Sequence, residues 1–321
     1  MFYSIRHVTR FHYSAQISES VMEVRMRPRT ELNQRCLKHE LHITPRVHID
    51  SFRDYLGNTV HHFDVPGVHS KLSIVSAAVV EVKTQNELPE GLAMNSWQNV
   101  DDCYQGCEHW EMQSPSKFAL ETEKLAELRQ DIGLDRSKDP LTTLRELNTR
   151  LYEEFAYIPK ATKVDSPIDL ALENRKGVCQ DFAHIMIALT RGLKIPCRYV
   201  SGYLHHRATD EDRSPSSATH AWVEANLPGL GWVAFDPTNN LLAGERHIRT
   251  AVGRDYADVP PTKGVFRGKA ASELSVSVRV STTDAPPDDN DVMVLVERTL
   301  PLPSNDADFD SNQQQQQQQQ Q

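Results

Sequence analysis

The sequence predicts an α+β protein in which a β-rich N-terminal domain precedes a core that packs a cysteine-bearing helix on an antiparallel sheet. Three patterns support this prediction. Between residues 2 and 84, apolar and polar residues alternate repeatedly, as they do in half-buried strands. Between residues 118 and 192, apolar residues recur at spacings of three and four, as they do on helices. From residue 196 to residue 236 the pattern is extended again.

The composition is that of an ordinary soluble protein, since 39% of the 321 residues are hydrophobic and 25% are charged. The net charge of -9 argues against nucleic acid or an acidic membrane as the main partner, because phosphate groups are bound through an excess of Lys and Arg. The N-terminus lacks the apolar core of a signal peptide, and no apolar run approaches the roughly 20 residues that cross a bilayer. We therefore expect a cytoplasmic protein of bacterial type.

The N-terminal domain is expected to span residues 1–85 and to form a small β-sandwich or barrel. Turn-forming residues, among them Pro66 and Gly67, separate its strand-like segments. The segments are Tyr3 to His7, Val21 to Met26, Leu37 to Ile43, Thr59 to Phe63 and Leu72 to Val82. Histidines near the start, such as His7 and His12, invite a metal site, but strand periodicity favours a structural role in which they lie on the solvent-facing side.

Residues 86–116 are predicted to form a connector with one short helix. Cys103 and Cys107 could share a helix face and supply half of a zinc site, but no second pair of Cys or His with zinc-like spacing follows. The five cysteines are odd in number and scattered, unlike a disulfide framework. We expect no metal and no cofactor, since no Gly-rich phosphate loop or calcium loop is visible.

The core is predicted to span residues 117–282. Phe118, Leu125, Leu128 and Ile132 mark one amphipathic helix, and a second begins at Asp139-Pro140. A third begins after Gly177 and ends near Gly192. Strands are expected at residues 196–204, 218–227 and 232–235, and a late strand at residues 274–280. Residues 283–321 form an extension with an uncertain strand at 291–298 and a glutamine tract that we expect to be disordered.

Cys179 is the candidate nucleophile, because it lies in the first turn of the predicted third helix. The dipole and the free N–H groups of a helix start favour a thiolate and can lower a cysteine pKa from about 8.5 to roughly 3.5–7.5. His220 begins one predicted strand and Asp236 ends the next, so a hairpin would place them side by side, as base and orienting carboxylate. Taken alone, a buried Cys is usually an apolar filler and a strand His is usually structural.

Several segments resemble the transglutaminase-like core of the papain-like cysteine enzyme class, and more closely the bacterial transglutaminase-like cysteine peptidase family. In the core these are residues 177–183 (GVCQDFA), 198–203 (RYVSGY), 219–223 (THAWV) and 232–238 (WVAFDPT). In the N-terminal domain, residues 7–13 (HVTRFHY), 25–28 (RMRP) and 54–58 (DYLGN) fit the β-rich domain with which members of that family begin. The resemblance covers roughly residues 1 to 282.

The resemblance implies Cys179 as nucleophile, His220 as general base and acid, and Asp236 as the group that orients the histidine. It implies the backbone N–H of Cys179 as the first oxyanion donor and a side chain upstream as the second, for which Tyr157 is the nearest suitable residue. Tyr157 could equally be a core tyrosine.

Two classes of function remain open. An enzyme would attack an amide of a peptide or protein substrate and form a thioester, and either water or an amine would then resolve it. The predicted residues are common to both outcomes, and the resemblance to the family favours hydrolysis of a peptide or isopeptide bond. Alternatively, the fold would serve as a non-catalytic peptide-binding module.

Overall fold

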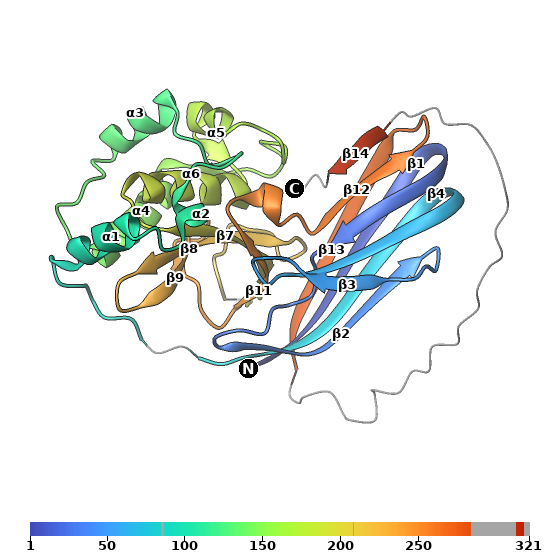
Figure 1. Ribbon diagram of the computed structural model, residues 1–321, viewed down its shortest axis with the longest axis horizontal. Helices are drawn as coiled ribbons and strands as arrows, with labels where there is room; N and C mark the ends of the chain where they lie inside the picture. Colours follow the sequence, from blue (N-terminus) through green and yellow to red (C-terminus); the bar gives the residue numbers. More distant parts are fainter. Residues whose placement is uncertain (85–86, 208, 284–312, 318–321) are drawn as a thin grey trace.

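The computed structural model describes residues 1–84, 87–207, 209–283 and 313–317. The protein is an α+β molecule with two lobes, one built from a large twisted sheet and one in which helices cover a second, smaller sheet (Figure 1). Neighbouring strands run antiparallel throughout both of these sheets. Among the described residues, no helix combines the length and apolarity needed to cross a membrane.

The first sheet has the strand order β14-β12-β1-β4-β2, with β13 also paired to β1 and β3 to β4. Its strands are β1 (Phe2–Val24), β2 (Gln34–Thr44), β3 (Asp50–Arg53), β4 (Thr59–Val82), β12 (Thr262–Arg267), β13 (Ser272–Thr283) and β14 (Gln313–Gln317).

Two long strands, β1 and β4, replace the shorter strands expected from the sequence. The predicted segment at Val21 continues β1, and the two segments on either side of Pro66 are one strand. The pairing of β1 with β4 shifts register on both sides of Ile17, which lies opposite His69. Nearby, Gly67 adopts a positive φ of 90°. Bulges of this kind bend a strand pair without ending it, which is why turn residues did not mark strand ends here.

The last strands of the chain return to the first sheet. β13 pairs with the first half of β1, and β12 pairs with its second half (Figure 1). The expected core limit at residue 282 therefore does not follow the sheets, because residues 262–283 complete the sheet of the N-terminal lobe. Gln313–Gln317, expected to be disordered, forms β14 on the outer edge of β12. The strand expected at residues 291–298 lies outside the described residues.

The second sheet has the order β10-β9-β8-β7-β11 and carries the helical lobe. Its strands are β7 (Cys197–Leu204), β8 (His220–Leu227), β9 (Gly231–Asp236), β10 (Leu241–Leu242) and β11 (His247–Gly253); β5 (Ala156–Tyr157) and β6 (Lys176–Gly177) form a separate parallel pair. The helices are α1 (Ser96–Gln105), α2 (Trp110–Gln113), α3 (Glu123–Asp131), α4 (Pro140–Glu154), α5 (Ile168–Asn174), α6 (Cys179–Gly192) and the 3-10 turn η1 (Tyr256–Asp258).

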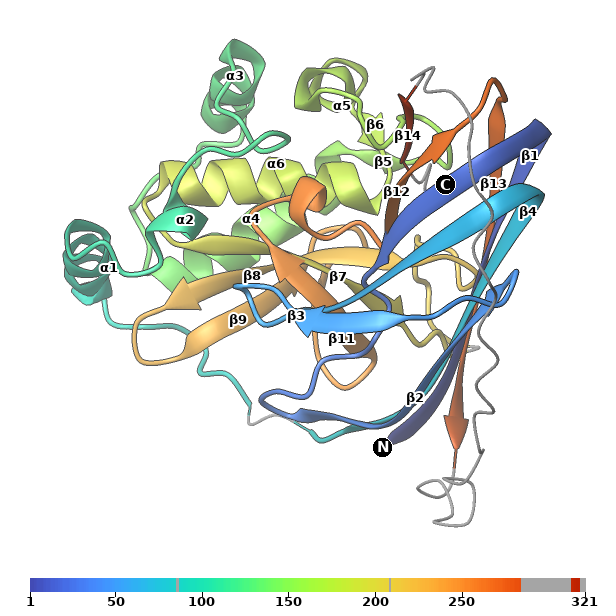
Figure 2. The same cartoon turned by 45° about the vertical axis from the view of Figure 1, so that its right-hand side comes forward.

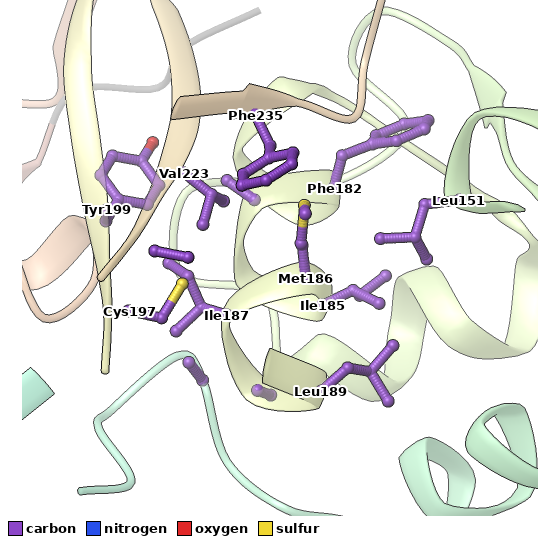
Figure 3. Packing of buried hydrophobic residues seen from close by; sticks show 14 of the residues in the cluster. Leu151, Phe182, Ile185, Met186, Ile187, Leu189, Cys197, Tyr199, Val223 and Phe235 are labelled. Atoms are coloured by element: carbon purple, nitrogen blue, oxygen red, sulfur yellow. The ribbon is translucent and has the colours of Figure 1, made fainter. Parts of the chain in front are cut away.

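α6 is the central helix of this lobe and is buried along almost its whole length. It lies across β7 and β8 on one side and meets α4 on the other (Figure 2). Phe182, Ile185 and Met186 pack between Leu151 of α4 and Phe235 of β9 (Figure 3). Each fully buried apolar side chain contributes roughly 1.5–3 kcal/mol, so the position of the first turn of α6 is held by a large core.

The N-terminal lobe covers the free edge of β11 with two side-chain amides. Gln34 accepts a hydrogen bond from the N–H of Arg249 at 2.8 Å and donates to its carbonyl at 2.9 Å. Asn58 does the same with Val252, at 2.8 Å in both directions. Each amide makes the pair of hydrogen bonds that a residue of a neighbouring strand would make. Backbone groups on the outer edge of β11 are satisfied in this way.

His7 lies in the contact between the lobes and not on a solvent-facing side, so the expectation from strand periodicity is wrong for this residue. Its side chain is fully buried, and its Nδ1 lies 3.0 Å from the Tyr203 hydroxyl of β7. Thr9 lies 3.2 Å from Nε2 of the same ring. The packing of one sheet on the other, which the sequence does not display, buries this face of β1.

Candidate active site

Cys179 is the first residue of α6, as the sequence predicts. The preceding turn is held by Asp181, whose Oδ2 accepts hydrogen bonds from the N–H of Val178 at 2.8 Å and from the hydroxyl of Thr162 at 2.5 Å. A Cβ on Gly177 would lie 2.6 Å from that oxygen, so only glycine fits there. The first N–H groups of a helix have no acceptor within it, and in this turn the N–H groups of Asp181 and Phe182 donate to the carbonyl of Val178, at 2.9 and 3.3 Å.

Asp181 is a buried carboxylate beside this cysteine. Burial raises its pKa to about 6, and the hydrogen bonds from Thr162 and from two backbone N–H groups limit the rise. The Asp181 side chain therefore acts as a hydrogen-bond acceptor that caps the start of α6. Its burial makes the charged form of the carboxylate less favourable.

β8 and β9 form the predicted hairpin, with Gly229 and Gly231 at positive φ values of 77° and 71° in the turn. His220 at the start of β8 and Asp236 at the end of β9 lie on the same face, with His220 Nε2 2.7 Å from Asp236 Oδ2. Both side chains are almost inaccessible to solvent. In this low-dielectric surrounding an ion pair is strong.

The charges of the two side chains are coupled. Burial lowers the pKa of His220, but the carboxylate of Asp236 and the thiol of Cys179 act against it and raise the pKa to about 10. Burial raises the pKa of Asp236, but His220 and then His247 lower it below its ordinary value. At neutral pH this favours an imidazolium beside an ionised carboxylate.

The structure brings Cys179 to the other side of the same ring. Cys179 is 5% exposed and His220 3% exposed, and the thiol is among the groups that raise the pKa of His220. Since Nε2 is engaged by Asp236, the nitrogen left for the thiol is Nδ1, which has no hydrogen-bond partner among the described residues. The three residues predicted from the sequence are therefore adjacent.

Trp222 fixes the plane of the His220 ring. The two rings are stacked, with centroids 6.1 Å apart and an angle of 30° between their planes. Gly202 of β7 leaves room for the indole, because a Cβ at that position would lie 2.5 Å from Trp222. Close packing restricts the imidazole to one orientation.

Tyr157, the candidate second oxyanion donor, lies on a strand that pairs with the residues just before α6. β5 pairs with β6 so that Tyr157 is opposite Gly177, and this strand pair lies beside α6 (Figure 2). Burial, and then the negative charges of Cys179 and Asp181, raise the pKa of Tyr157 above its ordinary value, so the hydroxyl keeps its proton. That hydroxyl is buried and makes no hydrogen bond with any described residue. An unused proton donor thus lies near Cys179.

Two further polar residues belong to this site that the sequence did not single out. Asn239 donates to Asp236 Oδ2 at 2.8 Å, and His247 of β11 lies 3.1 Å from the same oxygen. Asn239 directly follows the Asp-Pro-Thr segment and could have been found from that proximity. His247 carries no local signal, because only the pairing of β11 with β7 brings it to the site.

Other histidines and cysteines of the described chain, among them His184 and Cys197, lie outside this cluster. His184 points away from the thiol and accepts a hydrogen bond from the N–H of Tyr256 at 3.2 Å. Cys197 is buried, and burial raises its pKa to about 12, which makes it a poor nucleophile. Cys103 and Cys107 belong to no cluster of potential metal ligands among the described residues.

One cluster in the described part of the chain has the composition of a metal site: ligand atoms of His220, Asp236 and His247 lie within 4.8 Å of one another. The 2.7 and 3.1 Å separations are those of hydrogen bonds. Two ligands of a tetrahedral zinc ion, each at about 2.1 Å from the metal, would be about 3.4 Å apart. The geometry fits a hydrogen-bonded network better than a metal centre.

Comparison with protein families finds two matches. Residues 3–81 match the bacterial transglutaminase-like N-terminal region, and residues 129–237 match the transglutaminase-like superfamily. The second match contains all three adjacent residues, Cys179, His220 and Asp236.

Individual relatives extend the similarity over most of the chain. A Mycobacterium tuberculosis protein of unassigned function, Rv2569c, is 34% identical over 302 residues, which cover 87% of this chain and 92% of that protein. A protein-glutamine gamma-glutamyltransferase from Pseudomonas aeruginosa is 31% identical over 132 residues, which cover 36% of this chain and 19% of that protein. Among solved structures, a candidate cysteine protease from Cytophaga hutchinsonii has the same fold, with a TM-score of 0.67 and 23% identity over 89% of this chain and 93% of that one.

Proposed function

The chain belongs to the bacterial transglutaminase-like family, with that family's N-terminal region and core, and from this premise we propose that it is a cysteine-dependent hydrolase of amide or peptide bonds. The observation that carries the proposal is the placement of His220. One ring nitrogen is 2.7 Å from Asp236, and the other is free to face the thiol of Cys179. This is the arrangement of nucleophile, base and orienting carboxylate that acyl transfer requires.

In the first step, His220 holds the proton of Cys179 and the thiolate attacks the carbonyl carbon of the substrate amide. The first turn of α6 favours the negative sulfur through its free N–H groups and its dipole. The carbonyl oxygen becomes an oxyanion. The protonated Nδ1 of His220 then gives its proton to the leaving amine, the C–N bond breaks, and a thioester on Cys179 remains.

Two donors are available for the oxyanion. The N–H of Cys179 is the first, and the hydroxyl of Tyr157 is the second. Because that hydroxyl is buried, protonated and without a hydrogen-bond partner in the described part of the chain, an oxyanion would complete its hydrogen bonding. Removing one such donor typically costs about 10²- to 10³-fold in rate.

In the second step, water attacks the thioester while Nδ1 of His220 accepts a proton from it. A second tetrahedral intermediate collapses, the acid is released, and the thiol is restored. If an amine attacks in place of water, the same residues transfer the acyl group, and the similarity to a protein-glutamine gamma-glutamyltransferase keeps this as the second candidate function.

A peptide library offered with and without an added primary amine tests both outcomes. We expect new carboxyl ends or deamidated side chains without the amine, and a thioester on Cys179 in mass spectra of acid-quenched samples. An amine adduct formed in preference to the hydrolysis product would make the protein an acyltransferase.

Cys179→Ala and Cys197→Ala form a matched pair, because both thiols are buried but only Cys179 faces a histidine. The first variant should lose all turnover and the second should keep it. If Cys179→Ala processes the same substrates, or preserves the biological activity of the wild type, the protein is a binding module or works by another mechanism.

A further inference from the structure

Asp236 accepts more hydrogen bonds than an orienting carboxylate needs for one histidine. Its Oδ1 accepts from the N–H groups of Thr238 at 3.1 Å and Asn239 at 3.3 Å. Its Oδ2 lies 2.7 Å from His220, 2.8 Å from the Asn239 amide nitrogen and 3.1 Å from His247. Asp236 is fully buried, so every one of these donors comes from the protein itself.

The tautomer of His247 follows from its other nitrogen. The N–H of Gly244 points to Nδ1 of His247 at 3.3 Å, and a backbone N–H is always a donor. Nδ1 is therefore unprotonated and the proton lies on Nε2, which donates to Asp236. The ring is neutral: burial lowers the pKa of His247, and the charges of His220 and Arg246 lower it further against the opposing effect of Asp236.

The orientation of Asn239 is fixed in the same way. Its Oδ1 accepts the N–H of Arg213 at 2.8 Å and that of Ser214 at 3.2 Å. Its NH₂ group must therefore face Asp236 and the Ser214 hydroxyl. Backbone N–H groups can only donate. Those that donate to His247 Nδ1 and to Asn239 Oδ1 therefore fix His247 Nε2 and the Asn239 NH₂ group as the donors to Asp236 Oδ2.

We propose that His247 is a positioning residue, whose Nε2–H holds Oδ2 of Asp236 in line with Nε2 of His220. This rests on the proposed function of His220 as base and acid. His247 acts through Asp236, whose Oδ2 bridges the His247 and His220 rings, with centroids 6.1 Å apart; Trp222 packs edge-on against the His247 ring at 5.1 Å. Without His247, the Asp236 carboxylate keeps its charge but loses one of the hydrogen bonds that fix the position of Oδ2.

Two substitutions separate donation from packing. In His247→Gln the side-chain amide reaches the position of Nε2 and can still donate to Asp236, whereas His247→Leu fills the space without a donor. We expect His247→Leu to lower kcat by about 10-fold or more, and to lower the rate at which iodoacetamide alkylates Cys179 by a similar factor. This loss would be part of the roughly 10²- to 10⁴-fold that positioned acid–base catalysis supplies. KM should stay unchanged, and His247→Gln should restore most of the rate.

The ring itself can be observed in the wild-type protein. With ¹⁵N-labelled histidine, NMR at pH 7 and above should show a neutral His247 with its proton on Nε2. The charged groups facing it, namely Asp236, His220 and Arg246, are those considered above. This measurement stands even if His247→Leu fails to fold.

Equal alkylation rates in wild type and His247→Leu would overturn the proposal. So would a His247→Gln variant as slow as His247→Leu, since the ring would then act by packing alone, or a His247 proton on Nδ1. Alkylation does not require a substrate, so the proposal can be judged even if the wild type cleaves no amide; failure of the proposed function would appear only in turnover.

Discussion

Thr162 donates its hydroxyl hydrogen to Oδ2 of Asp181 at 2.5 Å and so ties the segment before α5 to the first turn of the cysteine helix. Next to this bond, Gln180 donates to the carbonyl of Val164 at 3.0 Å. The two bonds hold this segment against the start of α6. The same bonds place a buried carboxylate beside Cys179, where its negative charge opposes formation of the thiolate that the proposed reaction needs.

We predict that Asp181→Asn stabilises the protein at pH 7.5. Burial raises the pKa of Asp181 from 3.8 to about 6, so the folded state holds this proton more tightly than the unfolded chain does. The contribution of the group to stability is therefore greatest below about pH 4 and is lost as the pH rises through 6. Asparagine stays neutral and still accepts the bond from Thr162, so the free energy of unfolding should rise by about 2 kcal/mol.

Urea denaturation at pH 5 and pH 7.5 measures this effect. Asp181→Ala is the control, because it removes the charge together with the acceptor and should not gain stability. An Asp181→Asn variant with the same pH dependence as the wild type would contradict the prediction.

The pH dependence of stability on the alkaline side should depend on His220. Its pKa is raised from 6.5 to about 10, the effect of burial being outweighed by Asp236 and then Cys179. A proton held more tightly in the folded state stabilises the protein fully below about pH 6.5, and this contribution is lost as the pH rises through 10. The free energy of unfolding should thus decline between pH 7 and pH 10.

Chemical denaturation of His220→Gln over the same pH range should show a flatter profile. His12→Gln, at an exposed position of β1, should keep the wild-type profile. If the wild type and His220→Gln have the same slope, the coupling of His220 to its neighbours is weaker than the structure indicates.

Glu224→Gln should destabilise the protein strongly. Glu224 is fully buried between two guanidinium groups, with Oε1 2.5 Å from Arg249 Nε and Oε2 2.7 Å from Arg198 Nε. Glutamine leaves both arginines without a counter-charge, and breaking a buried ion pair costs about 3–5 kcal/mol. The measurement is again urea denaturation.

The matched control is Glu146→Gln, which breaks the ion pair with Lys138 on the surface, where both side chains are about half exposed. Such pairs contribute about 0–1 kcal/mol. Similar losses in the two variants would mean that Glu224 is not the centre of a buried network.

Asn58→Ala should loosen the contact between the lobes. It removes both hydrogen bonds to the backbone of Val252 and leaves buried backbone groups unsatisfied, at a cost of about 1–3 kcal/mol. Hydrogen exchange of the Val252 amide should become faster. Asn174→Ala is the control, because Asn174 is exposed and makes one bond to the Leu170 carbonyl; exchange at Val252 that responds equally to both changes would contradict the prediction.

Local patterns in the sequence are enough to predict some elements of the fold. α6 begins near Cys179 because Gly177 precedes an apolar helical repeat, and the hairpin of β8 and β9 follows from strand alternation around a glycine turn. A hairpin fixes which residues are neighbours, so the closeness of His220 and Asp236 could be inferred without a structure.

Other features join distant parts of the chain, and local sequence patterns do not predict them. The return of β12 and β13 to the first sheet, the burial of His7 and the approach of His247 to Asp236 all depend on strand pairings or sheet packing between segments far apart in sequence. Such pairings are selected by the total burial and hydrogen bonding of the folded chain, and no local period records them.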